Sequence, residues 1–158
     1  MSDAKRSFQH EHFPDGECFG CGPRNTAGLR IESFATTDDE MICDWTPRGE
    51  HSNGAGVLCG GVLGSILDCH AVTAAGQAFI RRDGEVRLAF TKEFTLQFLR
   101  PTPLVPLRLT ARVTELRTRS ALVLATVTVN GEVCVRFEGV FVIPRETAPA
   151  APPRGRSS

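Results

Sequence analysis

The sequence has no excess of charge of either sign and no long apolar run. Its 158 residues carry 18 lysines and arginines against 18 aspartates and glutamates, and the basic residues form no cluster. Nucleic acids and anionic membrane surfaces attract proteins through concentrated positive charge, so neither is expected as a partner. No apolar stretch reaches the roughly 18 residues that a transmembrane helix needs, so no membrane span is expected either.

The N-terminal sequence lacks the features of an export signal. MSDAKRSFQHEHF contains no apolar segment of the kind that a secretory signal carries. A cytoplasmic location is therefore predicted, and in that compartment thiols stay reduced. The chain is expected to keep six free cysteines: Cys18, Cys21, Cys43, Cys59, Cys69 and Cys134. Three of them, Cys43, Cys69 and Cys134, lie in patterned apolar segments, where a reduced thiol acts as a small hydrophobic residue.

The length of the chain favours one domain with a core of its own. Residues 1–16 carry charge and show little periodicity, so a flexible N-terminal arm is predicted there. Residues 144–158 are rich in Pro, Ala, Arg and Ser and poor in bulky apolar residues, which is typical of a disordered tail. The domain is expected to span residues 17–143.

Residues 60–79 have the periodicity of a buried α-helix. One face of that helix carries apolar side chains at steps of three and four: Leu63, Ile66, Leu67, Ala71, Ala74 and Ala75. A narrower stripe holds Ser65 and Asp68 together with Gly61. The glycine pair Gly60 and Gly61 begins the helix, where free backbone N–H groups and the helix dipole can bind an anion or a polarised carbonyl oxygen.

The segments on either side of this helix alternate with the period of two that strands have. Two short strands are expected before it and four longer ones after it: residues 30–36, 41–46, 86–99, 107–116, 121–129 and 133–143. Asn130 and Gly131, between the last two, are a strong signal for a tight hairpin. No β-α-β repeat is present. The pattern predicts an α+β fold, in which an antiparallel sheet of about five to six strands wraps around one long central helix.

Three stretches resemble the hotdog fold, and within it the PaaI-like (phenylacetyl-CoA thioesterase-type) acyl-CoA thioesterases. CFGCGPRNTAGLRI is similar to a C-x-x-C-G-x-x-N-x-x-G-L opening, and TKEFTLQFLRPTP is similar to the strand after the central helix. LCGGVLGSILD is similar to the family's H-G-G-x6-D signature, with Gly60, Gly61 and Asp68 at the matching spacing. Cys59 stands where most members have histidine. The resemblance covers roughly residues 18–143.

This resemblance implies an enzyme that hydrolyses an acyl-CoA thioester to free CoA and a carboxylic acid. The Gly61 N–H would donate to the oxyanion that forms on the thioester oxygen. Asp68 would act either as a general base on water or as a nucleophile, and the sequence does not separate these roles. Asn53 and Thr91 match family residues that lie near the thioester and the attacking water.

The resemblance also implies an assembly and a substrate-binding set. Related enzymes complete the site across a dimer interface, so a homodimer or a dimer of dimers is expected, with acyl-CoA as the other partner. Cys59, Gly60 and Ser65 are expected to contact the substrate. No cofactor and no metal are expected.

Other roles stay open for several reactive side chains. Asp68 could be an ordinary helix acid paired with an arginine. Cys59 could be a nucleophile at the helix N-terminus, with His51 as the nearest candidate for a partner. His70 lies about 200° around the helix from Asp68, so it is interpreted as a packing residue and not as the catalytic base.

The C-x-x-C pair of Cys18 and Cys21 has two further interpretations. His10 and His12 could complete four ligands for zinc, although a single C-x-x-C without a second pair is a weak zinc signal. A thioredoxin-like redox pair would need a β-α-β context that the sequence lacks. The family resemblance accounts for the pair without metal.

Two other functions are compatible with the same fold. The first is a non-catalytic module that binds acyl-CoA or an acyl carrier, if the missing family histidine has removed activity. The second is a hotdog dehydratase or hydratase, which normally brings an Asp/His pair in a loop context that is not found here.

Overall fold

The computed structural model describes residues 5–145 and consists of one sheet packed on one long helix. The sheet has six antiparallel strands in the order β1-β2-β4-β5-β6-β3. Their bounds are β1 Phe34–Ala35, β2 Glu40–Trp45, β3 Phe90–Phe98, β4 Leu107–Leu116, β5 Ser120–Val129 and β6 Glu132–Val142. The helices are α1 Phe8–His12, the short 3-10 turn η1 Gly49–His51, and α2 Gly60–Asp83. This confirms the predicted hotdog fold.

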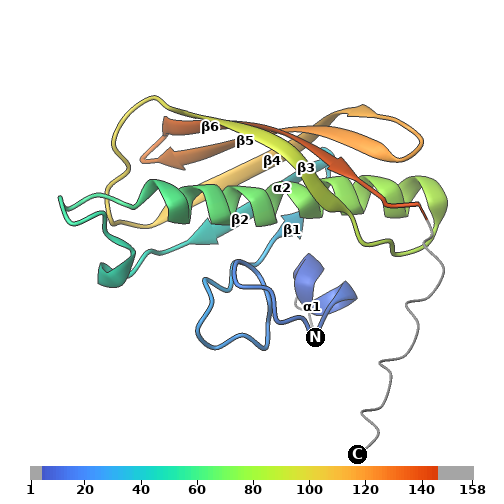
Figure 1. Ribbon diagram of the computed structural model, residues 1–158, viewed down its shortest axis with the longest axis horizontal. Helices are drawn as coiled ribbons and strands as arrows, with labels where there is room; N and C mark the ends of the chain where they lie inside the picture. The colour runs from blue at the N-terminus through green and yellow to red at the C-terminus, as the bar shows by residue number, and fades with distance from the viewer. Residues whose placement is uncertain (1–4, 146–158) are drawn as a thin grey trace, which may run out of the picture.

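The central helix α2 lies along one face of the sheet, and the N-terminal segment with α1 lies on the other side of that helix (Figure 1). The predicted apolar face of α2 is buried. Four of its residues are 0% exposed: Ile66, Leu67, Ala71 and Ala75. Opposite it, alternate residues of the sheet are buried, because successive strand residues point to opposite faces: Leu109, Val123, Val127, Val135 and Phe141. The fold therefore encloses α2 between the sheet and the N-terminal segment.

The helix extends four residues beyond its predicted end at Phe79. It ends at Asp83, and Gly84 adopts a left-handed conformation with φ 75° while its N–H donates to the Ile80 carbonyl at 2.8 Å. Glycine takes this conformation without the penalty that a side chain would bring, so Gly84 acts as the C-cap. Residues 81–83 are charged, so the apolar spacing that predicts the helix stops before its end.

The N-terminal prediction needs a correction between Ser7 and Phe13. The flexible arm predicted over residues 1–16 contains α1, in which Ser7 accepts a hydrogen bond from the His10 N–H at 3.3 Å. Phe8 is buried against Gly76 of α2, where a Cβ would lie 2.9 Å from the ring. A long-range contact orders this segment, and local periodicity does not reveal such contacts. Residues 1–4 and most of the predicted tail, residues 146–158, lie outside the described part of the chain.

The strand predictions differ from the structure mainly at the sheet edges. The first predicted strand, residues 30–36, shortens to Phe34–Ala35, and the strand predicted over residues 86–99 is Phe90–Phe98. Both β1 and β3 form sheet edges, where only one side of a strand has a hydrogen-bonding partner. The three strands β4, β5 and β6 agree with prediction to within one residue at each end.

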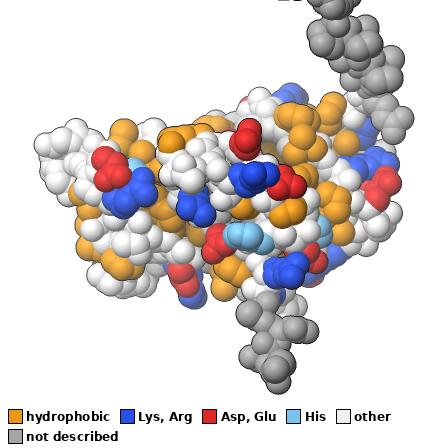
Figure 2. Space-filling model, turned by 90° about the horizontal axis from the view of Figure 1, so that it is seen from below, with side chains coloured by type: hydrophobic (Ala, Val, Ile, Leu, Met, Phe, Trp, Pro, Cys, Tyr) orange, Lys and Arg blue, Asp and Glu red, His pale blue; other side chains and the backbone are white. Residues whose placement is uncertain are grey.

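The molecular surface shows no region dominated by one charge on the face seen from the side of the N-terminal segment (Figure 2). Acidic and basic side chains are interspersed there, with apolar side chains between them. Among the described helices, none is both long enough and apolar enough to cross a membrane.

Candidate active site

The carboxylate of Asp68 lies in the middle of α2, beside the start of the edge strand β3. The Thr91 hydroxyl donates a hydrogen bond to Asp68 Oδ1 at 2.6 Å. No ion pair to Asp68 is formed among the described residues, so the arginine-paired alternative does not describe this chain. The structure thus brings together two of the four residues predicted to be catalytic.

The pKa of Asp68 is raised above its ordinary value. Burial is the main cause, since it disfavours the charged carboxylate, and the nearby Cys18 thiolate raises the pKa further. The hydrogen bond from Thr91 acts in the opposite direction because it stabilises the charged form. A carboxyl group whose pKa lies closer to neutrality is a stronger base than an exposed aspartate.

Asp68 and Thr91 both line a cavity of about 370 Å³ between the N-terminal segment, α2 and the beginning of β3. The walls are mainly apolar, with Phe8, Phe13 and Val72 among the contributing residues. Such a chamber suits the apolar part of a small ligand, and the carboxylate in its wall supplies a polar group. This cavity contains N-terminal residues that sequence reasoning did not assign to the site.

The N-terminus of α2 has the geometry expected of an anion-binding turn. Cys59 is the N-cap residue, and its side chain makes no capping hydrogen bond to the helix. The Gly61 residue is exposed, and a Cβ placed there would meet only Cys59 Sγ, at 3.9 Å. The first backbone N–H groups of a helix have no intrahelical acceptor, so this turn can donate to an incoming oxygen.

The N-terminus of α2 and the Asp68 carboxylate do not meet within one chain. Gly61 and Asp68 are seven residues apart in α2, and a rise of 1.5 Å per residue separates them by about 10 Å along the helix axis. A single carbonyl carbon cannot be within reach of both. Each chain therefore carries two separate candidate half-sites: the N-terminus of α2 around Gly61, and the pair of Asp68 and Thr91.

The other predicted site residues lie near the helix N-terminus. Ser65 donates from its hydroxyl to the Gly61 carbonyl at 3.0 Å, one turn away in α2. Asn53 lies in the preceding loop, where its Oδ1 accepts from the Ala55 N–H at 2.8 Å. Asn53 is exposed, whereas Cys59 and Gly60 are half-buried. This group is close in sequence to Gly61, and none of these residues lines the cavity that contains Asp68.

Two histidines have structural roles. His70 is fully buried, its Nε2–H donates to the Met41 carbonyl at 3.1 Å, and its Nδ1 accepts from the Ser33 hydroxyl at 2.8 Å. Burial lowers the pKa of His70 to about 4, so the ring is neutral at pH 7. A neutral, fully buried ring agrees with the interpretation of His70 as a packing residue. The His51 ring stacks on Trp45, and its Nδ1 accepts from the Arg48 N–H at 2.9 Å. Among the described residues, no hydrogen bond joins that ring to the Cys59 thiol.

The C-x-x-C pair lies beside Asp68, with a third cysteine that sequence reasoning did not connect to it. The sulfur atoms of Cys18, Cys21 and Cys69 all lie within 4.8 Å of one another, and Cys18 and Cys69 are 3.6 Å apart. The pKa of the Cys18 thiol is lowered to about 5 by the hydrogen bond with Cys69 and by backbone N–H groups of Cys21 and Gly20.

The predicted histidine partners of that pair lie elsewhere. His10 pairs with Glu32 at 2.8 Å, and the His12 ring packs edge-on against Phe8. The zinc alternative that used these two histidines is therefore wrong in its ligands. Cys69 could have been considered from its place next to Asp68, but only the packing of the N-terminal loop on α2 brings the three thiols together.

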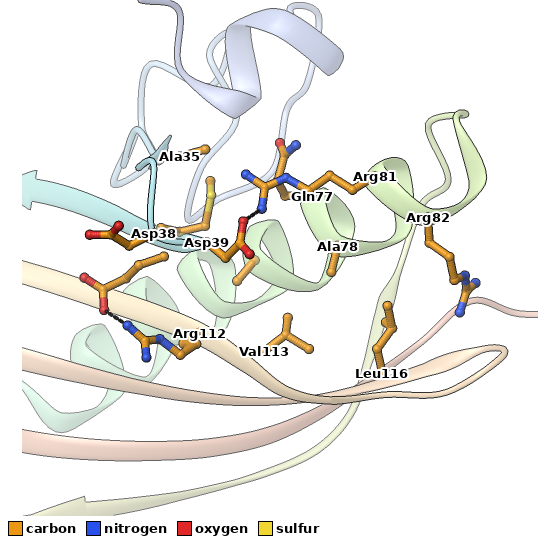
Figure 3. A pocket seen from close by; sticks show the side chains of 13 residues that line it. Ala35, Asp38, Asp39, Gln77, Ala78, Arg81, Arg82, Arg112, Val113 and Leu116 are labelled. Carbon is orange, nitrogen blue, oxygen red and sulfur yellow. Dashed lines mark hydrogen bonds and ion pairs between the residues drawn. The ribbon is translucent and has the colours of Figure 1, made fainter.

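A larger cavity of about 620 Å³ lies near the other end of α2, between that helix, β2 and β4 (Figure 3). Two ion pairs lie in its wall: Arg81 pairs with Asp39, and Arg112 pairs with Glu40 at 3.3 Å. These pairs are exposed to solvent and contribute little stability. The paired carboxylates of this cavity are thus neutralised by arginines, whereas the Asp68 carboxylate accepts from the Thr91 hydroxyl instead.

Comparison with solved structures finds the same fold in several thioesterases. A thioesterase superfamily protein is 27% identical over 79% of this chain, with a TM-score of 0.66, and this chain spans only 62% of that protein. A phenylacetic acid degradation-related protein from Ralstonia eutropha is 22% identical, covering 87% of this chain and 99% of its own, with a TM-score of 0.68. The PaaI protein of the Escherichia coli phenylacetic acid degradation operon is 19% identical, covering 74% and 81%, with a TM-score of 0.63.

Comparison of the sequence alone gives one family. No curated protein matches the chain significantly. The Thioesterase superfamily matches residues 55–135, which are just over half of the chain and include the helix N-terminus, Asp68 and Thr91. This match, which agrees with the hotdog fold of the structure, shows that the chain belongs to the thioesterase superfamily.

Proposed function

We propose that the protein is an acyl-CoA thioesterase that works as a homodimer, with Asp68 as general base and the Gly61 N–H as oxyanion donor. Membership of the thioesterase superfamily supports thioester hydrolysis as the reaction. The observation that carries the assignment of Asp68 is its hydrogen bond from Thr91 in the wall of an apolar cavity. The apolar chamber would receive the acyl group.

The chemistry requires one base and one oxyanion donor. Asp68 Oδ2 takes a proton from a water molecule while the water oxygen attacks the thioester carbonyl carbon, and the Thr91 hydroxyl on Oδ1 orients the carboxylate. The carbonyl oxygen becomes an oxyanion, which the Gly61 N–H stabilises by a few kcal/mol. When the carbonyl re-forms, the C–S bond breaks, and the CoA sulfur leaves and takes the proton from Asp68.

The dimer is proposed from the surface of β3. This edge strand exposes three phenylalanines, Phe90, Phe94 and Phe98, at 50%, 43% and 55%. An exposed apolar edge strand invites pairing with another strand, because its outer N–H and C=O groups have no partner in the sheet. Two copies of β3 paired antiparallel would continue the sheet across a twofold axis.

Such pairing would also bring the two half-sites together. Within one chain, α2 runs antiparallel to β3: Gly60 lies at the level of Phe98, and Asp68 lies at the level of Thr91. A twofold axis near Thr95 would place Thr91 of one copy opposite Phe98 of the other. Asp68 would then face the helix N-terminus of the second copy, which supplies the oxyanion donor missing near it.

A thiol-release assay with a panel of acyl-CoAs tests the proposed reaction. Asp68→Asn should lower kcat/KM by at least about a hundredfold, since it removes the base. Asp83→Asn is the matched control on the same helix, because Asp83 is paired with Arg82 at 2.6 Å away from the cavity, and it should retain activity. Cys59→Ala should also retain most activity, which separates the base from a Cys59 nucleophile.

Three results would contradict the proposal in different ways. No thiol release from any acyl-CoA would favour a non-catalytic binding module. Release that is unaffected by Asp68→Asn would remove the role of Asp68 but leave the family assignment. A monomer in sedimentation experiments at assay concentration would contradict the shared site.

A further inference from the structure

A cluster of three thiols joins the N-terminal loop to the central helix. Cys18 and Cys21 come from the turn-rich loop before β1, and Cys69 comes from α2. Among residues 5–145, no other group of three or more Cys, His, Asp and Glu side chains has its ligand atoms this close together. All three cysteines line the cavity that contains Asp68.

The spacing of these sulfurs suits a shared metal ion. Thiolates bound to zinc at about 2.3 Å in a tetrahedron lie about 3.8 Å from one another. The 3.6 Å between Cys18 and Cys69 is close to that separation. A disulfide would instead need the two sulfurs at about 2.05 Å.

The loop around the thiols is shaped to bring them together. A Cβ at Gly20 would lie 2.3 Å from Cys69 Sγ, and a Cβ at Gly22 would lie 2.4 Å from the Cys18 nitrogen. Any side chain at Gly20 would therefore push the third sulfur away from the pair. The Gly22 N–H donates to the Cys18 carbonyl at 2.8 Å, which closes the turn that carries Cys18 and Cys21.

We propose that Cys18, Cys21 and Cys69 bind a zinc ion through their thiolates. Three soft sulfur ligands in a tetrahedral arrangement select zinc over hard cations such as Mg²⁺ or Ca²⁺. Cys18 is exposed, so the fourth position is open to a water molecule. This site differs both from the metal-free expectation and from the sequence alternative that used His10 and His12.

Zinc at this position would link residues 18–21 to α2 one residue away from Asp68. The N-terminal loop forms part of the cavity wall and contains no helix or strand between α1 and β1. The ion would therefore fix the shape of the acyl chamber and would not act on the thioester itself. The proposal concerns this cysteine cluster and stands whether or not the chain is a thioesterase.

Metal analysis and cobalt spectroscopy of the full chain test the proposal. Protein purified under reducing, chelator-free conditions should contain one zinc per chain by mass spectrometry of the metal. Co²⁺ added to the zinc-free protein should give intense tetrahedral ligand-field bands together with thiolate-to-cobalt charge transfer. Cys18→Ser, Cys21→Ser and Cys69→Ser should each weaken Co²⁺ binding at least tenfold and reduce the charge-transfer band, whereas Cys134→Ser should change neither.

A second variant tests the geometry without removing a ligand. Gly20→Ala keeps all three thiols but places a Cβ against Cys69 Sγ, so it should also weaken Co²⁺ binding at least tenfold. Gly49→Ala is the matched control, because a Cβ there meets nothing within 4 Å. Circular dichroism identifies any variant that fails to fold. Co²⁺ binding by the variants that do fold then tests the proposed site.

Two outcomes would overturn the proposal. One is a metal-free protein that takes up Co²⁺ without charge-transfer bands, or with bands that survive all three serine substitutions. The other is a Cys18–Cys69 disulfide, found by mass spectrometry in protein kept under reducing conditions and not displaced by Zn²⁺. Either result would mean that the thiols come together without holding a metal.

Discussion

The hydroxyl of Thr91 donates to the carboxylate of Asp68 across the contact between the edge strand β3 and the central helix α2, at 2.6 Å. Asp68 comes from the middle of a mostly buried helix and Thr91 from the exposed start of a strand, 23 residues later. This pair fixes which oxygen of the carboxylate remains free. The hydrogen bond from Thr91 also lowers the pKa of Asp68, against burial and the Cys18 thiolate, which raise it.

Substitution of Thr91 should therefore change both rate and pH dependence. Thr91→Val removes the donor, so kcat should fall roughly tenfold or more because the carboxylate is no longer oriented. The hydrogen bond lowers the pKa of Asp68, so its loss should raise that pKa and move the acid limb of kcat/KM to higher pH. Thr91→Ser should restore both quantities, since it keeps the hydroxyl.

The matched control for this experiment is Thr114→Val on β4. Thr114 donates to the Leu122 carbonyl at 3.3 Å and lies outside the cavity that contains Asp68. The Thr114→Val variant should therefore have the pH–rate profile of the wild type. An unchanged acid limb in Thr91→Val would show that Asp68 is not the group whose ionisation controls the rate.

A side chain at Gly61 should reduce activity without reducing stability. Gly61→Ala adds a Cβ whose nearest neighbour is Cys59 Sγ at 3.9 Å, so the fold accommodates it. Alanine favours a helix over glycine by up to about 1 kcal/mol, so the melting temperature should stay the same or rise. The kcat/KM should fall at least about tenfold, because the methyl group blocks the approach of the thioester oxygen to the N–H.

Gly64→Ala gives the comparison for this effect on the same helix. Its Cβ would be in ordinary contact with Leu96 at 3.4 Å, away from the first turn. Thermal unfolding and thiol release measured on both variants should show similar stabilities and different activities. Equal activities would argue against Gly61 as the oxyanion donor.

A charge on the outer strand should separate the proposed dimer. Phe98→Glu places a carboxylate on β3 where the phenylalanine is 55% exposed, so the folded monomer tolerates it. Burial of that charge in the interface should weaken dimerisation at least about tenfold, or about 1.4 kcal/mol. Sedimentation velocity over a concentration series measures this change.

Leu116→Glu at the end of β4 is a suitable control, since Leu116 is 38% exposed and lies away from β3. It should leave the sedimentation coefficient of the dimer unchanged. If Phe98→Glu sediments like the wild type, the edge strand is not the interface.

The buried ring of His70 should make stability fall in mild acid. Its pKa is about 4 in the folded chain against 6.5 for an ordinary histidine, so below pH 6.5 the unfolded chain binds a proton that the folded chain does not. Stability should thus fall from near pH 6.5 until the folded ring itself protonates near pH 4. Between pH 7 and pH 5 the loss from this residue is about 2 kcal/mol.

Urea unfolding at both pH values measures this loss. His70→Gln keeps a donor for the Met41 carbonyl but does not titrate, so its stability should change less between pH 7 and pH 5 than that of the wild type. An equal loss of unfolding free energy between pH 7 and pH 5 in both proteins would contradict the assignment of a neutral His70 ring.

The sequence alone predicted the elements whose signals are local. The helix was recognised from the spacing of Ile66, Leu67 and Ala71, because one side of a helix faces the core every three to four residues. The strands β4, β5 and β6 were recognised because alternate residues are buried. The spacing from Gly61 to Asp68 could be read directly, since both lie on one helix.

Contacts between distant segments could not be read in this way. Nothing in the local pattern of Phe8 indicates that it packs on Gly76, so α1 was missed. Thr91 was named from a family resemblance, and only the packing of β3 against α2 places its hydroxyl on Asp68.

The sequence by itself therefore determined the hotdog architecture, the polar stripe of the helix and the family. Tertiary structure decided which side chains meet: Thr91 with Asp68, and Cys69 with Cys18 and Cys21. The physical reason is that periodicity reports which face of an element is buried. It does not report which distant residue covers that face, because this depends on how the whole chain packs.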